Sequence, residues 1–164
     1  MIKQPVEDMI KHSLEKYADM VRKISFLYLR NRDDVDDVFQ EVFLKFLQNK
    51  VPFKNDQHEK AWLIRVTINK CKDLCKSFWR KNIDIIDGHE IAFEDQAESE
   101  LMQAVLALPT KYKDVIYLFY YEGYTVVEIA KMLEQKENTI YSNLHRARKL
   151  LKQKLGDDAN EYTF

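Results

Sequence analysis

The segment DVDDVFQEVFLKFL, residues 34–47, contains the most regular apolar pattern in the chain. Its apolar residues recur at intervals of three and four, so they form one continuous stripe on an α-helix. They are Val35, Val38, Phe39, Val42, Phe43, Phe46 and Leu47. We expect Asp33 or Asp34 to cap the N-terminus of this helix, where acidic side chains also favour the positive end of the helix dipole. A helix with one apolar face must pack on other elements, so the segment predicts a helical core.

Helical apolar spacing continues on both sides of this segment. Residues 6–29 and residues 61–81 each predict a helix, and a polar loop over residues 51–60 precedes the second of them. The chain of 164 residues contains only three Gly and three Pro, so it lacks the turn residues that a β-sandwich or barrel requires. Because 46% of its residues are apolar, it can form packed cores. We therefore predict an all-α fold.

The second half of the chain predicts a further set of helices. Residues 101–108 form a short amphipathic pattern that ends at Pro109. The motif TVVE at residues 125–128 is a capping box, in which Thr and Glu each accept a hydrogen bond from a backbone amide at the start of a helix. A polar turn over residues 134–137 leads to a basic helix over residues 138–155. Two helices joined by about four residues form a helix-turn-helix, whose second helix enters the major groove of DNA.

Charge is distributed unevenly along the chain, although its net value is only −1. Residues 50–81 contain nine Lys or Arg against three Asp or Glu, and residues 101–155 contain nine against five. Between these blocks, residues 82–100 contain seven acidic residues and no Lys or Arg. Residues 31–49 contain five acidic residues and two basic ones. Basic blocks within folded helices indicate surfaces that face a polyanion, or else ordinary solvated helix faces.

The acidic segment also predicts the domain organisation. Its apolar residues follow no helical period, so we interpret residues 82–100 as a flexible linker between two small helical domains, residues 1–81 and residues 101–157. Residues 158–164 are left as a tail. Fully extended, the linker spans at most about 60 Å. Two turns of a DNA duplex span about 70 Å, so the domains could occupy separate sites on one duplex.

Two cysteines, Cys71 and Cys75, are four residues apart on the helix predicted over residues 61–81. No second Cys or His pair completes a four-ligand metal site. We interpret them as reduced thiols, with a metal site or a redox switch as the alternatives. On the same helix, further residues are expected to face the core, namely Trp62, Leu63, Val66, Leu74 and Phe78.

Motifs for catalysis and for membrane insertion are absent from the sequence. We find no paired catalytic carboxylates, Gly-rich phosphate loop or nucleophile–base motif. We therefore expect no catalytic residue, no cofactor, no metal and no small-molecule substrate. Charges interrupt the longest apolar runs before they reach membrane-spanning length, and the N-terminus lacks a cleavable apolar segment. We expect a soluble protein of the cytoplasm.

The chain resembles the extracytoplasmic-function sigma factors, the two-domain members of the bacterial sigma-70 family. The motif DVDDVFQEVF at residues 34–43 is similar to the family's region 2.2, and AWL at residues 61–63, with Asn69 and Asp73, is similar to the segment that follows it. Four motifs are similar to region 4, namely LP at 108–109, YEGYT at 121–125, EIA at 128–130 and LHRAR at 144–148. Together these motifs cover most of residues 6–155 in the family's order.

The resemblance implies that the protein binds core RNA polymerase and directs it to promoters. A region 2 helical bundle would dock Asp37, Gln40 and Glu41 on the clamp helices of the β′ subunit. The same bundle would bind and open the minus-10 element through Phe53, Lys54, Asn55, Arg65, Asn69, Lys72, Lys76 and Arg80. A region 4 helix-turn-helix would contact the β flap and would read the minus-35 element through Asn138, Thr139, Tyr141, Ser142, His145, Arg146 and Lys149.

The resemblance further implies control by an anti-sigma factor, which could hold the protein at the membrane until a stress signal arrives. The acidic linker would either occupy the channel that nascent RNA later fills or act as a solvated tether. The chain departs from the family at the turn of the helix-turn-helix. There the family usually has Gly, an apolar residue and Ser where this chain has Glu134, Gln135 and Lys136. Asn138 could then cap the second helix. Tyr141 and Asn143 stand where the family commonly has basic residues.

Two other functions fit parts of the sequence. A stand-alone helix-turn-helix regulator would bind duplex DNA without polymerase, but it leaves the acidic helix and the basic-aromatic helix after it unexplained. A protein-interaction adaptor would bind a basic partner through the acidic helix. Run-off transcription with core polymerase separates these functions, since a regulator would not support initiation and an adaptor would show no promoter preference.

Overall fold

The computed structural model describes residues 3–81 and 96–156. Within these residues it contains helices joined by short turns and loops and no strand, so the all-α prediction is confirmed. The chain divides into two compact units, unit 1 over Met1–His89 and unit 2 over Glu90–Phe164. Most of the linker predicted over residues 82–100, and all of the tail predicted over residues 158–164, lie outside the described residues.

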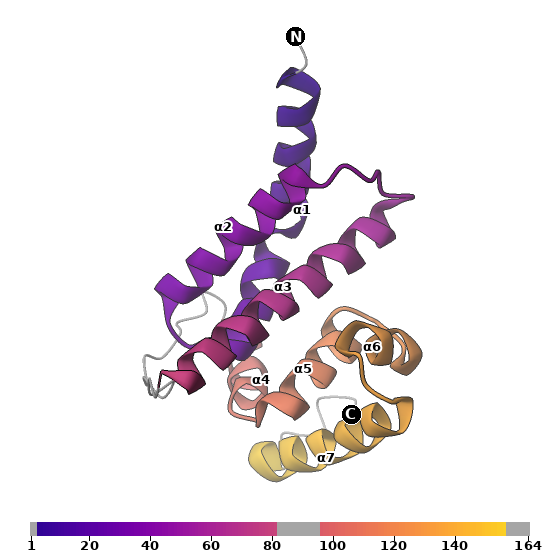
Figure 1. Ribbon diagram of the computed structural model, residues 1–164. Helices are drawn as coiled ribbons and strands as arrows, with labels where there is room; N and C mark the ends of the chain where they lie inside the picture. Colours follow the sequence, from indigo (N-terminus) through magenta and orange to yellow (C-terminus); the bar gives the residue numbers. More distant parts are fainter. Residues whose placement is uncertain (1–2, 82–95, 157–164) are drawn as a thin grey trace. The chain divides into compact units, whose positions relative to one another are not determined.

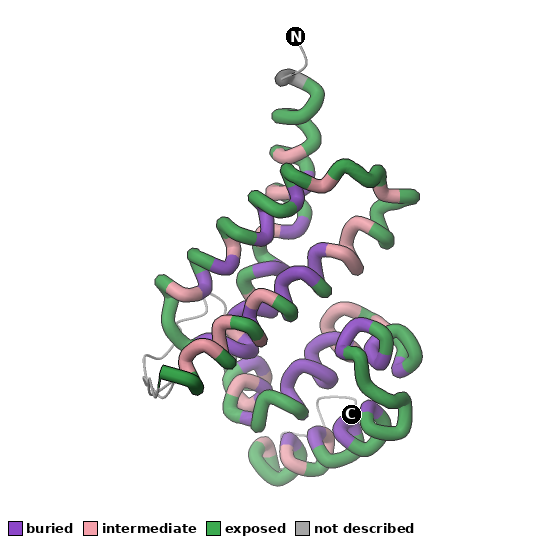
Figure 2. Tube along the Cα trace, viewed as in Figure 1, coloured by how far each residue is buried: buried purple, intermediate pink, exposed green. Residues whose placement is uncertain are grey.

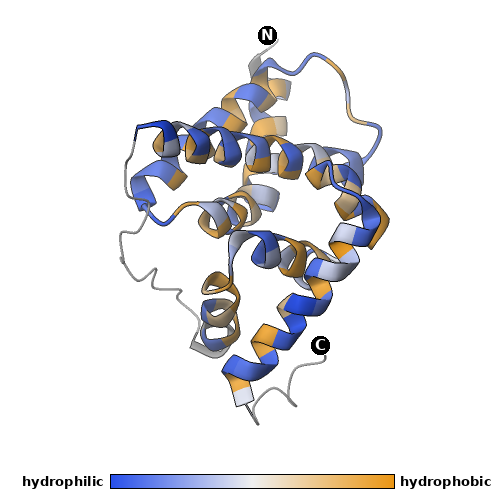
Figure 3. Ribbon diagram, turned by 60° about the horizontal axis from the view of Figure 1, so that its bottom comes forward, coloured by the Kyte–Doolittle hydropathy of each residue, from blue (hydrophilic) through white to orange (hydrophobic). Residues whose placement is uncertain are grey.

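Unit 1 is a bundle of three helices, α1 (Lys3–Tyr28), α2 (Arg32–Gln48) and α3 (Asp56–Arg80), each of which packs on the other two (Figure 1). The first turns of α1 extend beyond the other two helices, and the buried residues gather where the three helices face one another (Figure 2). The core is aliphatic and aromatic, and its most buried members include Val21, Ile24, Leu27, Val35, Val42, Leu63, Ile64 and Ile68. Each helix mixes hydrophobic and hydrophilic residues along its length, as one-sided burial requires (Figure 3).

Helix caps in unit 1 differ from those predicted. The N-cap of α2 is Asn31, whose side chain accepts a hydrogen bond from the backbone N–H of Asp33 at 2.7 Å. Asp33 and Asp34 lie in the first turn, where they favour the helix dipole without capping. Helix α3 begins at Asp56, before the predicted end of the loop, because the Asn55 side chain caps it by accepting from the His58 amide at 2.9 Å.

The buried stripes of α2 and α3 are rotated slightly from the predicted ones. In α2, Leu47 is 45% exposed although the sequence pattern placed it in the core, because it lies at the C-terminal end of the helix. In α3 the buried residues are Leu63, Ile64, Val66, Thr67, Ile68 and Cys71. Trp62, Leu74, Cys75 and Phe78 are only half-buried. Thr67 is accommodated because its hydroxyl donates to the Leu63 carbonyl at 2.6 Å.

Unit 2 contains α4 (Gln96–Leu106), α5 (Thr110–Ile116), a π-helical turn η1 (Tyr117–Tyr121), α6 (Val126–Leu133) and α7 (Glu137–Leu155). Helix α7 packs on α4, α5 and α6. The start of α4 lies five residues before the predicted end of the linker, because Gln, Ala and Glu are strong helix formers although residues 96–100 belong to the acidic segment.

The helix-turn-helix of unit 2 is formed by α6 and α7. The predicted capping box is present, since the Thr125 N–H donates to Glu128 Oε2 at 2.8 Å and the Glu128 N–H donates to Thr125 Oγ1 at 3.2 Å. Helix α6 ends at Glu134, which has a left-handed backbone with φ of 55°. The N-cap of α7 is Lys136, without a side-chain cap hydrogen bond, so the prediction that Asn138 caps this helix is wrong. The helix begins two residues too early for Asn138 to be its N-cap.

We predict that Glu134→Gly stabilises unit 2. A residue with a Cβ costs about 1–2 kcal/mol in the left-handed region, whereas glycine loses about 0.5–1 kcal/mol more chain entropy on folding. The unfolding free energy should therefore rise by about 0.5–1 kcal/mol. Hydrogen exchange of the α6 and α7 amides measures it. Gln135→Gly is the matched control, since Gln135 has a negative φ, and should lower the same free energy. A Glu134→Gly chain no more stable than wild type would contradict the prediction.

We also predict that the two cysteines react at very different rates in the folded chain. Burial raises the pKa of Cys71 from 9.0 to about 12, so at pH 8 its thiolate is about a thousandfold scarcer than that of an ordinary cysteine. Cys75 is half-buried, with its Sγ 3.6 Å from the Tyr28 carbonyl oxygen. Iodoacetamide followed by mass spectrometry should modify Cys75 first in native protein and both equally in urea. Equal native rates would contradict this.

Candidate functional site

The residues predicted for polymerase binding line a groove between α2 and α3. Asp37, Gln40 and Glu41 are exposed on the outer face of α2. Across the groove, whose volume is about 480 Å³, α3 contributes other side chains. Together the lining residues include Asp37, Gln40, Glu41, Leu44, Lys70, Asp73, Leu74 and Ser77. The structure therefore brings the three predicted residues into one surface and adds the α3 side chains, which no spacing within α2 could have indicated.

The groove combines apolar surface with negative charge. Leu44 is 54% exposed on its α2 wall. Lys70 Nζ lies 3.4 Å from Glu41 Oε2 in an exposed pair, which contributes little stability and leaves the groove open to a partner. At the start of α2, partial burial raises the pKa of Asp34, and the neighbouring carboxylates of Asp37 and Asp33 raise it further. An exposed leucine among carboxylates is typical of a surface that binds a partner with both apolar and basic groups.

The loop between α2 and α3 is held by an aromatic cluster. The Phe53 ring stacks on Phe46 with centroids 5.9 Å apart and meets Trp62 at 5.5 Å and His58 at 5.4 Å. Phe53 is half-buried as a result, so the ring predicted to contact the minus-10 element is largely engaged within unit 1. We interpret Phe53 as a positioning residue for the loop.

Hydrogen bonds give the same loop a defined backbone. The Lys54 N–H donates to His58 Nδ1 at 3.1 Å, beside the Asn55 cap described above. The following turn is tied to α1, since Lys16 Nζ lies 2.9 Å from Asp56 Oδ2 and lowers the pKa of that carboxyl. The side chains of Lys54 and Asn55 remain exposed. The loop therefore presents these two polar residues from a fixed frame.

The remaining residues predicted for the minus-10 element share one face of α3. At 3.6 residues per turn, they fall within a sector of about 80° and extend over about 23 Å. We call this set the basic stripe, and its members are Arg65, Asn69, Lys72, Lys76 and Arg80. All are exposed except Lys72, which is half-buried. The stripe occupies a different face of α3 from the groove.

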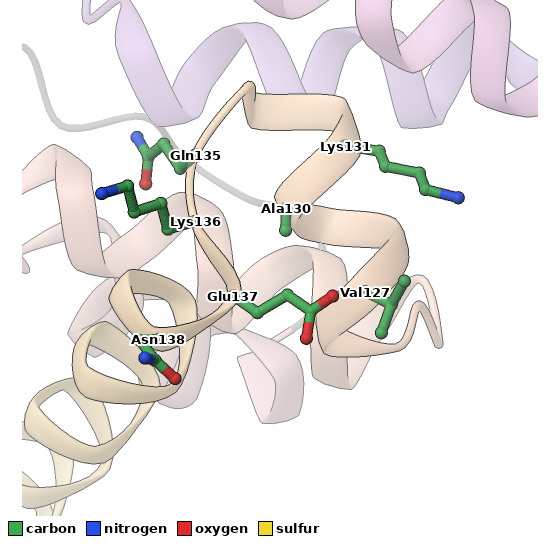
Figure 4. Close-up of a pocket in the computed structure, with 7 residues that line it drawn as sticks. All are labelled: Val127, Ala130, Lys131, Gln135, Lys136, Glu137 and Asn138. Atoms are coloured by element: carbon green, nitrogen blue, oxygen red, sulfur yellow. The ribbon is translucent and has the colours of Figure 1, made fainter.

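The residues predicted to read the minus-35 element are all exposed on α7, and they are Asn138, Thr139, Tyr141, Ser142, His145, Arg146 and Lys149. Ile140, Leu144 and Ala147 are buried and set the orientation of this face. A hollow of about 480 Å³ lies at the turn before α7 and is lined by side chains including Lys131, Gln135 and Lys136 (Figure 4). Three of its residues, Lys136, Glu137 and Asn138, come from the N-cap and the first turn of α7.

Two arginines and one asparagine of α7 are engaged in contacts or buried within unit 2. A hydrogen bond from the Arg146 side chain lowers the pKa of Tyr112, so this arginine is anchored on α5. Arg148 Nε donates to Tyr120 Oη at 2.7 Å, which ties α7 to the π-helical turn. Asn143 is buried, so its departure from the family pattern falls on the inward face.

Neither metal binding nor membrane insertion is supported within the described residues. Across residues 3–81 and 96–156, no group of three or more His, Cys, Asp or Glu side chains could hold a metal ion. In the same residues, no helix is long and apolar enough to cross a membrane.

Comparisons with known proteins match both units. The family model described as Sigma-70 region 2 matches residues 14–81, and that described as Sigma-70, region 4 matches residues 98–151. The chain is 27% identical to the RNA polymerase sigma factor SigV of Bacillus subtilis over 156 aligned positions, which cover 92% of this chain and 93% of SigV. It is 23% identical to the ECF RNA polymerase sigma factor SigW of the same species, covering 95% of this chain and 94% of SigW.

A solved structure has the same fold. The sigma factor RpoE from Bartonella quintana, crystallised in complex with the anti-sigma factor NepR, superposes with a TM-score of 0.72 at 20% identity. The match covers 90% of this chain and 97% of RpoE.

Proposed function

The chain belongs to the sigma-70 family as an extracytoplasmic-function member, and we propose that it recruits core RNA polymerase to promoters through the three surfaces described above. It is therefore a transcription initiation factor and not an enzyme. The observation that carries the proposal is that one chain contains both kinds of unit. Unit 1 matches region 2 and exposes the acidic groove and the basic stripe, whereas unit 2 matches region 4 and exposes a basic helix-turn-helix.

The groove between α2 and α3 is the proposed docking surface for the clamp helices of the polymerase β′ subunit. Gln40 supplies hydrogen-bonding groups, Asp37 and Glu41 supply charge, and Leu44 supplies apolar area. A partner helix with basic and apolar side chains would replace Lys70 beside Glu41 at little cost, because the existing pair is exposed.

The loop and the basic stripe are the proposed minus-10 surface. Unpairing a base costs a few kcal/mol, so a protein that opens DNA must hold the displaced base. The loop presents Lys54 and the side-chain NH₂ group of Asn55 for this, since Asn55 Oδ1 caps α3. The stripe lies along α3 to neutralise the phosphates of the opened strand. The exposed residues of α7 are the proposed minus-35 surface, and unit 2 would also contact the β flap.

We further propose that an anti-sigma factor controls this protein. The support is the fold shared with RpoE, which was crystallised with the anti-sigma factor NepR. Such a factor would compete for the acidic groove with polymerase, and a membrane-bound one would hold the chain at the membrane. Run-off transcription with core polymerase on genomic fragments tests the proposed function, since a stand-alone regulator would not support initiation.

We expect Gln40→Ala combined with Glu41→Lys to weaken assembly with core polymerase tenfold or more, about 1.4 kcal/mol. The double variant removes a hydrogen-bonding group and reverses a charge in the groove. Fluorescence anisotropy of the labelled chain measures the dissociation constant. Asp36→Lys is the matched control, because it makes the same charge change on α2 outside the groove. A double variant that assembles as well as the wild type would count against the docking surface.

We expect Arg146→Ala to weaken holoenzyme binding to duplex minus-35 DNA and to lower the salt slope by about 1, the effect of losing one phosphate contact. Tyr112→Phe removes the hydroxyl that Arg146 contacts and should leave the slope unchanged. Lys154→Ala removes a like charge at the other end of α7 and should do the same. If Arg146→Ala leaves the slope unaltered, this arginine acts on Tyr112 and not on DNA.

A further inference from the structure

Trp79 is the most exposed large apolar side chain among the described residues, with 81% of its surface accessible. It lies in the last turn of α3, one residue before Arg80. Tryptophan normally buries much of its large apolar surface. The other tryptophan of the chain, Trp62, does so by packing against Phe46 and Phe53. The exposure of Trp79 therefore requires an explanation outside the packing of unit 1.

Helix geometry places Trp79 at the edge of the basic stripe. At 100° per residue, Trp79 is rotated only about 20° from Lys72 around the axis of α3, and about 10 Å further along it. Lys76 lies about 60° from Trp79 around the axis and Arg80 about 100°, and Lys81 follows at the helix end. These three cations are all exposed. The indole ring thus lies beside the C-terminal end of the basic stripe, which is about 23 Å long.

The charge around Trp79 selects the kind of partner. Residues 76–81 contain three cations and no acidic residue, so a polyanion fits this end of α3 better than an apolar protein surface. Along the axis of a DNA duplex the phosphates of one strand are spaced by about 3.4 Å, so the stripe spans six or seven nucleotides in duplex geometry and fewer of a more extended single strand. An aromatic ring beside such a row can stack on a base of any kind, because every base has a π-face.

We propose that Trp79 stacks on a base at one end of the strand held by the basic stripe. This contact adds an apolar term to the electrostatic binding by Lys76 and Arg80, and it tolerates any base at that position. The inference rests on the proposed function, since it assumes that the stripe holds promoter DNA. It adds a residue that the predicted minus-10 set lacks.

The test uses holoenzyme assembled from the full chain and a promoter fragment that wild-type holoenzyme selects from genomic DNA. Binding is measured to a forked version of this fragment, with the minus-10 region single-stranded, over a range of salt concentrations. Trp79→Ala and Trp79→Leu should bind five- to 150-fold more weakly, the equivalent of about 1–3 kcal/mol. Their salt slopes should match that of wild type, because no charge is removed. Trp79→Phe keeps a ring and should retain most of the affinity.

Two controls separate stacking from other effects. Met9→Ala alters another exposed apolar residue, 51% accessible, on α1 and outside both the stripe and the loop, and should bind the fork like wild type. Lys76→Gln combined with Arg80→Gln should lower the salt slope by about 1–2. Since Trp79 is exposed, its variants should unfold at the wild-type temperature.

Three results would overturn the inference. Wild-type affinity of Trp79→Ala for the fork, with a lowered slope for the Lys76 and Arg80 double variant, would leave the proposed function intact but exclude stacking. Weakened assembly of Trp79→Ala with core polymerase in the absence of DNA would assign Trp79 to a protein contact. A wild-type holoenzyme that selects no promoter fragment would overturn the proposed function and the stacking role together.

Discussion

The burial of one face of α3 between α1 and α2 is the constraint on which unit 1 depends. Leu63, Ile64 and Ile68 are almost completely buried, and they set the rotation of a helix whose other faces carry the functional residues. One remaining face closes the groove with α2, and another carries the basic stripe. Because close-packed cores tolerate little rearrangement, the two surfaces keep a constant angle to each other. No moving part is needed to present both the proposed polymerase surface and the proposed DNA surface.

In unit 2 a different set of contacts fixes the orientation of the helix that carries the exposed polar face. Helix α7, which carries the proposed minus-35 surface, is oriented by buried aliphatic residues and is held by Arg148, which donates to Tyr120 and lies over the rings of Phe119 and Tyr120. The π-helical turn that supplies these rings also buries Tyr117 and Leu118, continuing the buried run of α5. The planar guanidinium of Arg148 can stack on aromatic faces, so it is well suited to holding α7 against the π-helical turn.

Local patterns predicted the helices, the family and the capping box at Thr125, because periodicity and capping depend on neighbours in sequence. The family resemblance marked the position of Glu134 as one where glycine is usual, and there the backbone is left-handed. The sequence pattern did not show which of several neighbouring polar side chains caps α2. It predicted Asp33 or Asp34 and missed Asn31. Contacts between helices lie beyond any such pattern. The sequence could not show that Leu44 lies on the α2 wall of a groove facing α3, or that Phe53 packs on Phe46 and Trp62. Both features depend on how the helices cross.

The sharing of α3 by two surfaces restricts how this chain can diverge. Insertion or deletion of one residue within α3 would turn everything beyond it by about 100°. The groove side chains near Asp73 would then exchange places with stripe or core residues, so both partners would be lost at once. Substitutions can change affinity for either partner separately, whereas the length of this helix is expected to stay constant among descendants. Changes in chain length are expected in the segments between helices, because there they do not rotate side chains away from their partners.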